Sequence, residues 1–343
     1  MMDPDGNDLT NWNVSGDLEG ICIADHNSDF VYLGVEHPDT ISEFDIITGS
    51  VTRSFDLTPW MTGSANLGLE ALTFVADSTN AEGGLFYAGL QNDGKIYLFE
   101  LPIQSSPTST SVTYIETIIP VAGRSDLSGL HYETSNNILF AIWDSSNNIR
   151  AMETDGSNIV EWDLPGNDQE GITLFNGEDS QSKVIFVAED TGKEVWKYDF
   201  SGEIDITINN NGSVVSTPEL PVFFGTSVSL LSIPDEGNYF VEWSNDLTGN
   251  SNPETILLNR DKTITATFDL LEFPGNIIIS ITSDSVHLIW DEIPDAAGYN
   301  VYSSADPYAD YDSWNLEAEG ILQANWSQSI ISEIKYYYVS AVY

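Results

Sequence analysis

The chain of 343 residues carries 54 acidic and 10 basic side chains, a formal net charge of −44, and 41% of its residues are hydrophobic. A chain of this length and apolar content can form two or three packed domains. Nucleic-acid phosphates and anionic lipid headgroups attract Lys and Arg, so the charge excludes electrostatic binding to either. The excess of carboxylates suits saline or calcium-rich surroundings, although solubility alone explains it equally well.

Cys22 is the only cysteine, which excludes an intramolecular disulfide and a cysteine zinc site. Its position in an apolar strand pattern predicts a small buried thiol. No run of about 18 apolar residues occurs, so we expect no transmembrane segment. Residues 1–8 lack the pattern of a signal peptide. We therefore expect either a cytoplasmic protein or a chain that starts downstream of its true start.

A short motif recurs about every 40 to 60 residues in the first half of the chain, and each copy leads from a turn into an apolar strand. Glu19, Glu70 and Glu170 occupy the same motif position, and Ser128 occupies it in the third copy. The copies span residues 17–23, 68–74, 126–132 and 168–174. Repetition at this period, with strands between the copies, is typical of the blades of a β-propeller.

Each motif strand is followed by two more strand patterns in a fixed order. The second strands are expected at 30–36, 85–91, 138–144 and 184–189, and the third strands at 41–45, 95–99, 149–153 and 194–198. Three to four strands per repeat predict about four blades within residues 1–202. Residues 10–15 resemble an outer strand without a blade of its own, which predicts that they complete the last blade and close the ring. Further blades upstream of this chain are also expected.

Two smaller β modules are predicted after the propeller, at residues 203–270 and 271–343. The order of strands in the first, with Gly237–Ser244 and Lys262–Phe268, resembles the divergent InlB-type B-repeat of bacterial surface proteins. In the second, residues 286–302 resemble strands B and C of a fibronectin type III domain, and 335–342 resemble strand F. This resemblance implies a β-sandwich with Trp290 and Tyr299 as core anchors and its last strand beyond the end of the chain. Both modules imply a secreted or cell-surface protein.

Residues 10–200 resemble the SdiA-regulated family of bacterial β-propellers and the related esterase-like phytase family. The resemblance rests on the Glu-Gly motifs, on Gly-Leu-Glu-Ala-Leu at 68–72 and on Asp-Leu-Ser-Gly-Leu at 126–130. It implies a channel lined by carboxylates, commonly with calcium. Ser128 departs from the acidic pattern, so a symmetric ring of four carboxylates is not expected.

The residue types at the ends of the second strands independently favour a cation site. Calcium takes about six to eight oxygen ligands from carboxylates, carbonyls and waters. We therefore predict metal ligands at Glu19, Glu70, Glu170, Glu36, Asp144 and Glu189, and further ligand-binding groups at Gln91, Ser128 and His37. Without a cation such carboxylates would raise one another's pKa. A structural role, in which each glutamate caps a turn within its own blade, is the alternative and is slightly favoured.

Catalysis has less support in the sequence. A Gly-x-Ser-x-Gly elbow, a His-Glu-x-x-His motif and a glycine-rich phosphate loop are absent. His37 is the best-placed general acid or base, yet a surface role is more common for such a histidine. Only seven Lys or Arg lie in residues 1–202, which is few for phosphate-ester chemistry. Exposed tryptophans could stack on sugar rings, although packing within a blade is the commoner role.

The sequence thus predicts an all-β, secreted or surface-attached protein: a calcium-binding propeller that takes a small-molecule, glycan or cell-surface ligand, followed by two β-sandwich-like modules. Ligand binding or adhesion is the first hypothesis. A calcium-dependent hydrolase of phosphate or carboxylic esters is the alternative.

Overall fold

The computed structural model describes residues 6–7, 9–64, 66–176, 183–235, 237–270, 274–294, 296–309, 313–330 and 335–342. Within these residues the chain is all-β apart from short 3-10 turns such as η1 (Asp144–Ser146). No helix in this part of the chain has the length and apolar character that a membrane crossing needs. The chain forms two compact units. The first contains Met1–Glu203, Pro218–Val228 and Ile256–Asp261, and the second contains Ile204–Thr217, Ser229–Thr255 and Lys262–Tyr343.

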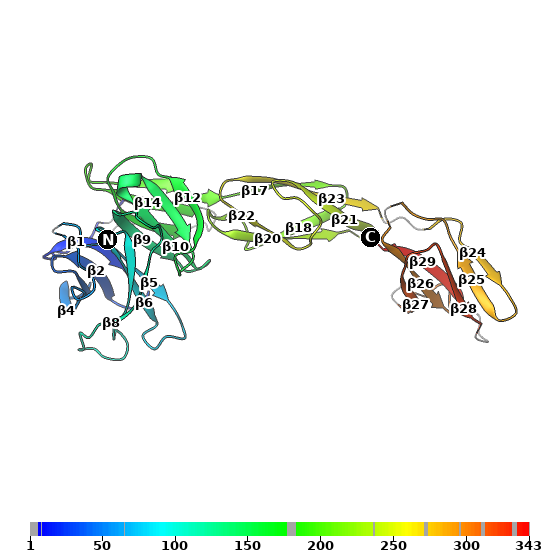
Figure 1. Ribbon diagram of the computed structural model, residues 1–343, viewed down its shortest axis with the longest axis horizontal. Helices are drawn as coiled ribbons and strands as arrows, with labels where there is room; N and C mark the ends of the chain where they lie inside the picture. Colours follow the sequence, from blue (N-terminus) through cyan, green and yellow to red (C-terminus); the bar gives the residue numbers. More distant parts are fainter. Residues whose placement is uncertain are drawn as a thin grey trace. The chain divides into compact units, whose positions relative to one another are not determined.

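Four antiparallel sheets, which we call blades 1 to 4, make up most of the first unit, and the strands of each follow chain order (Figure 1). Blade 1 consists of β1 (Asp17–Cys22), β2 (Phe30–Glu36), β3 (Thr40–Asp45) and β4 (Ser50–Asp56). Blade 2 consists of β5 (Leu69–Ala76), β6 (Gly84–Leu90), β7 (Lys95–Glu100) and β8 (Thr113–Ile118). Blade 3 consists of β9 (Leu127–Glu133), β10 (Ile138–Trp143), β11 (Asn148–Met152) and β12 (Asn158–Asp163). Blade 4 has three strands, β13 (Gln169–Asn176), β14 (Lys183–Glu189) and β15 (Glu194–Asp199).

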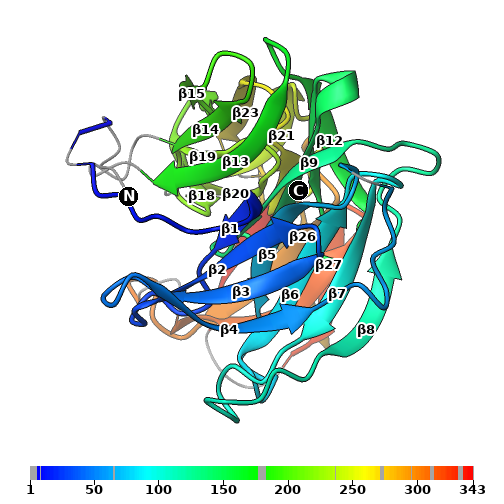
Figure 2. The same cartoon turned by 90° about the vertical axis from the view of Figure 1, so that its left-hand side faces the viewer.

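The blades are arranged as in a propeller, with the motif-bearing strands innermost. Each first strand contacts the first strand of the next blade, and β13 also touches β1 (Figure 2). The predicted all-β propeller, with three to four strands per repeat, is therefore confirmed. The strands form because branched and aromatic residues alternate with polar ones between turns rich in Gly, Asn and Asp.

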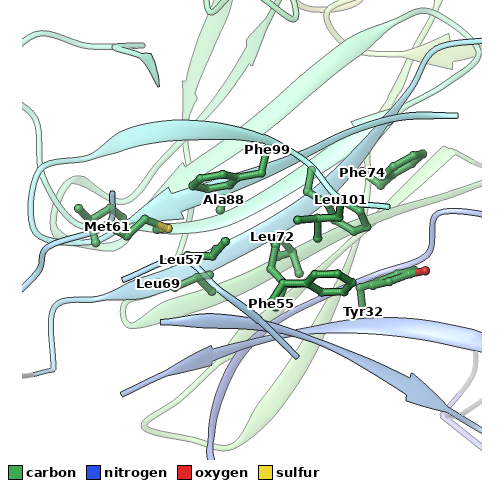
Figure 3. Packing of buried hydrophobic residues seen from close by; sticks show 13 residues of the cluster. Tyr32, Phe55, Leu57, Met61, Leu69, Leu72, Phe74, Ala88, Phe99 and Leu101 are labelled. Carbon is green, nitrogen blue, oxygen red and sulfur yellow. The ribbon is translucent and has the colours of Figure 1, made fainter. Parts of the chain in front are cut away.

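Apolar clusters between neighbouring blades hold the repeats together. Between blades 1 and 2, Tyr32 and Phe55 pack with Leu72 and Phe86 in a fully buried core (Figure 3). Cys22 packs against this cluster, and burial raises the pKa of its thiol. Corresponding clusters lie between blades 2 and 3 and between blades 3 and 4. Burying apolar faces between sheets is what makes a repeat architecture stable, because a single blade cannot cover its own faces.

The segment that was expected to complete blade 4 lies on blade 1 instead. Trp12 donates a hydrogen bond from its Nε1 to the Ile46 carbonyl at 3.1 Å and packs edge-on against Phe44. Residues 10–15 form no strand. The predicted closure of the ring by this segment is therefore wrong, because the indole finds its carbonyl partner and an aromatic neighbour in the β3–β4 hairpin.

The short strands β16 (Ser201–Gly202) and β19 (Val222–Phe223) pair at the end of the first unit. Among the described residues, the second unit is built largely from four three-stranded sheets, which follow one another in two pairs. The first pair comprises β17 (Ile204–Asn209), β23 (Lys262–Leu270) and β21 (Asn238–Asn245), and β18 (Gly212–Thr217), β20 (Ser227–Pro234) and β22 (Glu254–Leu257). The second pair comprises β24 (Ile278–Ile281), β25 (Ser285–Ile289) and β28 (Asn325–Ser329), and β27 (Asn315–Ile321), β26 (Gly298–Ser304) and β29 (Tyr336–Val342).

Two predicted core residues anchor the second of these pairs. Trp290 and Tyr299 are buried and pack edge-on, with ring centroids 5.4 Å apart. The Tyr299 hydroxyl accepts a hydrogen bond from the Ile293 backbone N–H. Their predicted role as core anchors is confirmed.

Candidate functional site

A β-bulge sits at the motif position in all four blades. The pairing register of the first two strands skips one residue in each blade, and the skipped residues are Glu19, Glu70, Ser128 and Glu170. A bulged residue has no ladder partner and its side chain is redirected relative to the alternating pattern. The repeated motif therefore marks a bulge that turns one side chain per blade out of the alternating pattern of its strand.

Small residues follow each bulge because the first strands approach one another closely there. A Cβ on Gly20 would lie 2.8 Å from the Cβ of Leu72 and 2.9 Å from its backbone nitrogen. A Cβ on Gly129 would lie 3.1 Å from the Ile172 side chain on β13 and 2.8 Å from the Ile142 side chain within its own blade. Alanine occupies the corresponding position in blade 2, at Ala71. A glycine after the bulge is thus a packing requirement in blades 1 and 3, whereas a Cβ on Gly171 in blade 4 would meet only Ala188, at an ordinary 3.5 Å.

The bulges converge on a pocket of about 780 Å³. All four bulged residues line it, and so do Glu36, Gln91 and Glu189 from the predicted set. Aliphatic side chains also line it, among them Leu72, Leu130 and Ile172. None of the described residues that line the pocket is basic. Seven of them are acidic: Asp17, Glu19, Glu36, Glu70, Glu170, Glu189 and Asp190.

Three of these carboxylates form the tightest group. Asp17, Glu19 and Glu36 each offer an oxygen, and the three oxygens lie within 4.8 Å of one another. Glu36 is 2% exposed and its Oε1 accepts a hydrogen bond from the Gly68 N–H at 2.5 Å. This bond fixes the carboxylate at the joint between blades 1 and 2. Asp17 was not predicted as a ligand, although it lies in the first motif, two residues before Glu19.

Glu70 is the most perturbed carboxyl group in the pocket. It is 8% exposed, and burial raises its pKa to about 9, with further contributions from the charges of Glu19, Glu170 and Glu36. Burial and the neighbouring Asp17 also raise the pKa of Glu19. With a pKa of about 9, Glu70 keeps its proton at neutral pH in the absence of a cation.

A second acidic group lies on the side of blades 3 and 4. Burial raises the pKa of Glu170 to about 7, and the charges of Asp144 and Asp126 add to the effect. Asp144 does not line the pocket; its Oδ1 accepts a hydrogen bond from the Gln169 backbone N–H at 3.1 Å. Burial, followed by the charge of Asp126, raises the pKa of Asp144 as well. Its contribution to the pocket is thus electrostatic.

Ser128 and Gln91 differ in whether their side chains keep a hydrogen-bonding atom available to a ligand. The fully buried Ser128 hydroxyl donates to the Gln169 carbonyl at 2.7 Å, which joins blades 3 and 4. Gln91 Oε1 is buried without a hydrogen-bond partner and belongs to a residue that lines the pocket. A structural role therefore explains Ser128, while Gln91 retains an acceptor for a ligand.

The pairing register changes the set of strand-end residues by one position in blade 4. In blade 1, Glu36 pairs with Asp17, which lies two positions before the bulge. In each other blade, the residue in the place of Glu36 donates its backbone N–H to the carbonyl of the residue two positions before the bulge. The equivalent residues are Glu36, Gln91, Asp144 and Asp190, whereas Glu189 pairs with Gln169 one step earlier. Asp190 was missed because the sequence does not reveal where the bulge shifts the register.

The histidines lie apart from this chemistry. His37 does not line the pocket; its Nε2 accepts a hydrogen bond from the Asn66 backbone N–H at 3.1 Å. Burial lowers the pKa of His131 to about 4, and its Nδ1 lies 3.4 Å from the Thr173 hydroxyl. His131 is half-buried and neutral at neutral pH, and it is a packing residue.

The comparisons with known proteins assign one segment of the chain. Residues 203–271 match the family described as the divergent InlB B-repeat domain, which confirms the resemblance predicted for residues 203–270. The comparison with curated proteins gave no significant match.

Two solved structures are similar to the chain at low sequence identity. One is the glutaminyl cyclase of Myxococcus xanthus, with 15% identity and a TM-score of 0.38 over 54% of this chain and 66% of the cyclase. The other is the β-propeller domain of Cps50 (Swd1) from Myceliophteria thermophila, with 12% identity and a TM-score of 0.30 over 75% of this chain and 91% of that domain. The chain therefore spans just under two thirds of the length of the cyclase.

Proposed function

We propose that the first unit is a ligand-binding propeller whose pocket holds a hard divalent cation, calcium. The observation that carries the proposal is the group of three carboxylate oxygens from Asp17, Glu19 and Glu36 within 4.8 Å of one another. A calcium ion lies about 2.4 Å from its ligands, so oxygens on opposite sides of it are about 4.8 Å apart. The three oxygens are therefore close enough for small side-chain movements to bring them onto one ion.

The donor set of the pocket fits calcium better than zinc. Its lining offers carboxylates, the amide oxygen of Gln91 and backbone groups, while neither cysteine nor histidine is among the described lining residues. Hard cations prefer oxygen ligands, and zinc prefers nitrogen and sulfur. A bound cation would also replace the proton on Glu70 and so offset the cost of grouping these acids. When bound, the ion would supply positive charge for anionic or hydroxyl groups of a ligand.

Calcium titration followed by thermal unfolding tests the proposal. A ligand at about 100 times its dissociation constant stabilises the folded state by about 2.7 kcal/mol, or roughly 5–10 °C in a unit of this size. We expect a rise of this order in the wild type and in Glu153→Gln, an exposed control outside the pocket. In Asp17→Asn and Glu36→Gln, the same rise in melting temperature should require at least a tenfold higher calcium concentration. A melting temperature that responds to neither calcium nor chelator in the wild type would exclude the cation site.

We further propose that the protein acts outside the cell or at its surface. The divergent InlB B-repeat match at residues 203–271 supports this placement, because the family resemblance implies a surface module. The final module supports a fibronectin type III-like assignment through its sheet orders, β24-β25-β28 and β27-β26-β29, and its buried Trp290. In this proposal the two C-terminal modules serve as spacers or adhesion modules. Fractionation of the producing cells, with detection by antibody, tests the location.

A calcium-dependent ester hydrolase, of the esterase-like phytase kind, is the second candidate. It is favoured by two carboxyl groups of different acidity in one pocket, Glu70 with a pKa of about 9 and Glu170 with a pKa of about 7. One could hold a proton as a general acid while the other accepts one. Phosphate esters have less support than carboxylic esters, because no basic side chain lines the pocket among the described residues. Turnover of either ester that chelator abolishes and that Glu70→Gln and Glu170→Gln each lower by at least a hundredfold would establish catalysis.

A further inference from the structure

Trp196 is exposed in a way that sets it apart from the other tryptophans described in the first unit. It is 49% exposed, whereas Trp143 is fully buried and Trp162 donates a hydrogen bond to the Asn259 carbonyl while packing among phenylalanines. Trp12 and Trp60 are also packed against aromatic neighbours. Packing within a blade therefore accounts for the other four but leaves half of the Trp196 indole uncovered.

Trp196 and Tyr198 form a parallel pair on β15. Trp196 lies opposite Val187 and Tyr198 lies opposite Ile185, so both side chains are on the same face of blade 4. The rings are nearly parallel, 9° apart in orientation, with centroids separated by 6.3 Å. Tyr198 packs against the buried cluster between blades 3 and 4, which anchors the pair. The two aromatic residues are thus held in place before any ligand arrives.

Carboxylates flank this aromatic pair and connect it to the pocket. Trp196 Nε1 lies 3.4 Å from Glu189 Oε2, and Glu189 lines the pocket. The exposed Glu194 lies directly across from Glu189 in the pairing of β14 and β15. The exposed part of the Trp196 indole beside hydrogen-bond acceptors matches a pyranose ring, whose C–H face stacks on an aromatic ring while its hydroxyls donate to carboxylates.

We propose that Trp196 and Tyr198 form a platform for a neutral, pyranose-based glycan, which this chain binds beside the pocket. The hydroxyls of the glycan donate to Glu189 and Glu194. Uronic-acid oligomers are excluded, because their carboxylates would face these acids in a protein of net charge −44. The platform does not depend on the cation proposed for the pocket.

Calorimetric titration of the full chain tests the platform, with cellohexaose, mannohexaose and chitohexaose as neutral probes and hexagalacturonate as the acidic probe. Each titration is run once with calcium and once with chelator. We expect a neutral hexasaccharide to bind under both conditions and hexagalacturonate not to bind. Trp196→Ala should weaken the binding by about tenfold, as loss of one stacking contact predicts, and Trp196→Phe by less.

Val195→Ala is the matched control, since Val195 is a neighbour on the same strand, has similar exposure and lies on the opposite face. It should bind like the wild type. Circular dichroism and the calcium-dependent melting shift of Trp196→Ala should also be unchanged, which separates this platform from the proposed cation site. Absence of binding by all three neutral probes at millimolar concentration would overturn the proposal. Wild-type affinity in Trp196→Ala, or an equal loss in Val195→Ala as expected for a polypeptide strand added along β15, would overturn it too.

Discussion

Replacement of Glu70 by glutamine should make the calcium-free protein more stable at neutral and alkaline pH. Burial and neighbouring acids raise the pKa of Glu70 from 4.5 to about 9. Between these two values the folded protein keeps the proton and the unfolded chain loses it, so the free energy of unfolding falls as the pH rises. The contribution of Glu70 to the free energy of unfolding is fully present below pH 4.5, and it is lost progressively up to about pH 9. Glutamine carries no charge at any pH and keeps hydrogen-bonding groups in the same place.

The size of this effect follows from the shift itself. One pKa unit corresponds to about 1.4 kcal/mol, so the loss between pH 4.5 and pH 7 is on the order of 3 kcal/mol. In a unit of about 200 residues this corresponds to roughly 5–10 °C in melting temperature. Glu70→Gln should remove most of that loss in chelator, and it should also weaken the stabilisation by calcium, because one negative charge beside the three ligands is gone.

Thermal unfolding of the two proteins in chelator, followed from pH 4.5 to pH 9, is the measurement. The melting temperatures should coincide near pH 4.5 and diverge steadily above it, with the variant higher. Glu153→Gln, at an exposed position, should follow the wild-type curve throughout. Parallel curves for the wild type and Glu70→Gln across this range would refute the reasoning, since they would show that Glu70 titrates alike in the folded and unfolded chains.

Three further predictions concern the framework around the pocket. Arg53→Ala removes the cation of a buried ion pair and the donor to three loop carbonyls. It should therefore lower the free energy of unfolding, measured by urea titration, by about 3–5 kcal/mol. Lys95→Ala breaks a partly exposed ion pair and should lower it by less than about 1 kcal/mol. Gly20→Ala should cost about 1–3 kcal/mol in the same assay because its Cβ meets a neighbouring strand at 2.8 Å, while Gly171→Ala, with 3.5 Å of clearance, should be tolerated. Trp290→Ala should destabilise only the C-terminal module, by about 3–5 kcal/mol, and leave the calcium response unchanged in a melt that separates the transitions. Equal losses in the two members of either matched pair, or a calcium response altered by the third variant, would contradict the corresponding prediction.

The buried ion pair illustrates what the sequence leaves open. Glu43 and Arg53 lie on adjacent strands, yet nothing in the sequence indicates that Arg53 also donates to the carbonyls of Pro102, Ser106 and Ser109 in blade 2. Burial raises the pKa of Glu43, but hydrogen bonds from Arg53 and Thr52 outweigh it and hold the pKa below its usual value. Contacts between blades depend on how far each hairpin reaches, and local patterns do not encode that distance.

The strands and their order follow from the sequence alone. The alternation of branched, aromatic and polar residues between turns predicts the second strand at 30–36, and β2 (Phe30–Glu36) has these bounds. The resemblance of residues 203–270 to a B-repeat and the burial of Trp290 and Tyr299 were also predictable. Such features depend on neighbours in the chain and on the simple need to bury one face of each strand.

The repeat itself predicted that Glu19, Glu70 and Glu170 share a position, because a period in the sequence becomes a rotation about the propeller axis. It did not predict that this position is a bulge, that Asp17 joins the carboxylate group, or that Asp190 replaces Glu189 in the set of strand-end residues. A bulge changes the register by one residue, and that change depends on the packing of neighbouring blades.

Sequence thus determined which side chains recur once per blade, since hydrophobic alternation and the motif spacing are local properties. Tertiary structure alone decided which of them meet. The hydroxyl of Ser128 donates to a carbonyl of the next blade, Asp144 does not line the pocket, and residues 10–15 lie on blade 1. Each of these outcomes depends on partners far away in the chain, whose distances are fixed only when the blades pack against one another.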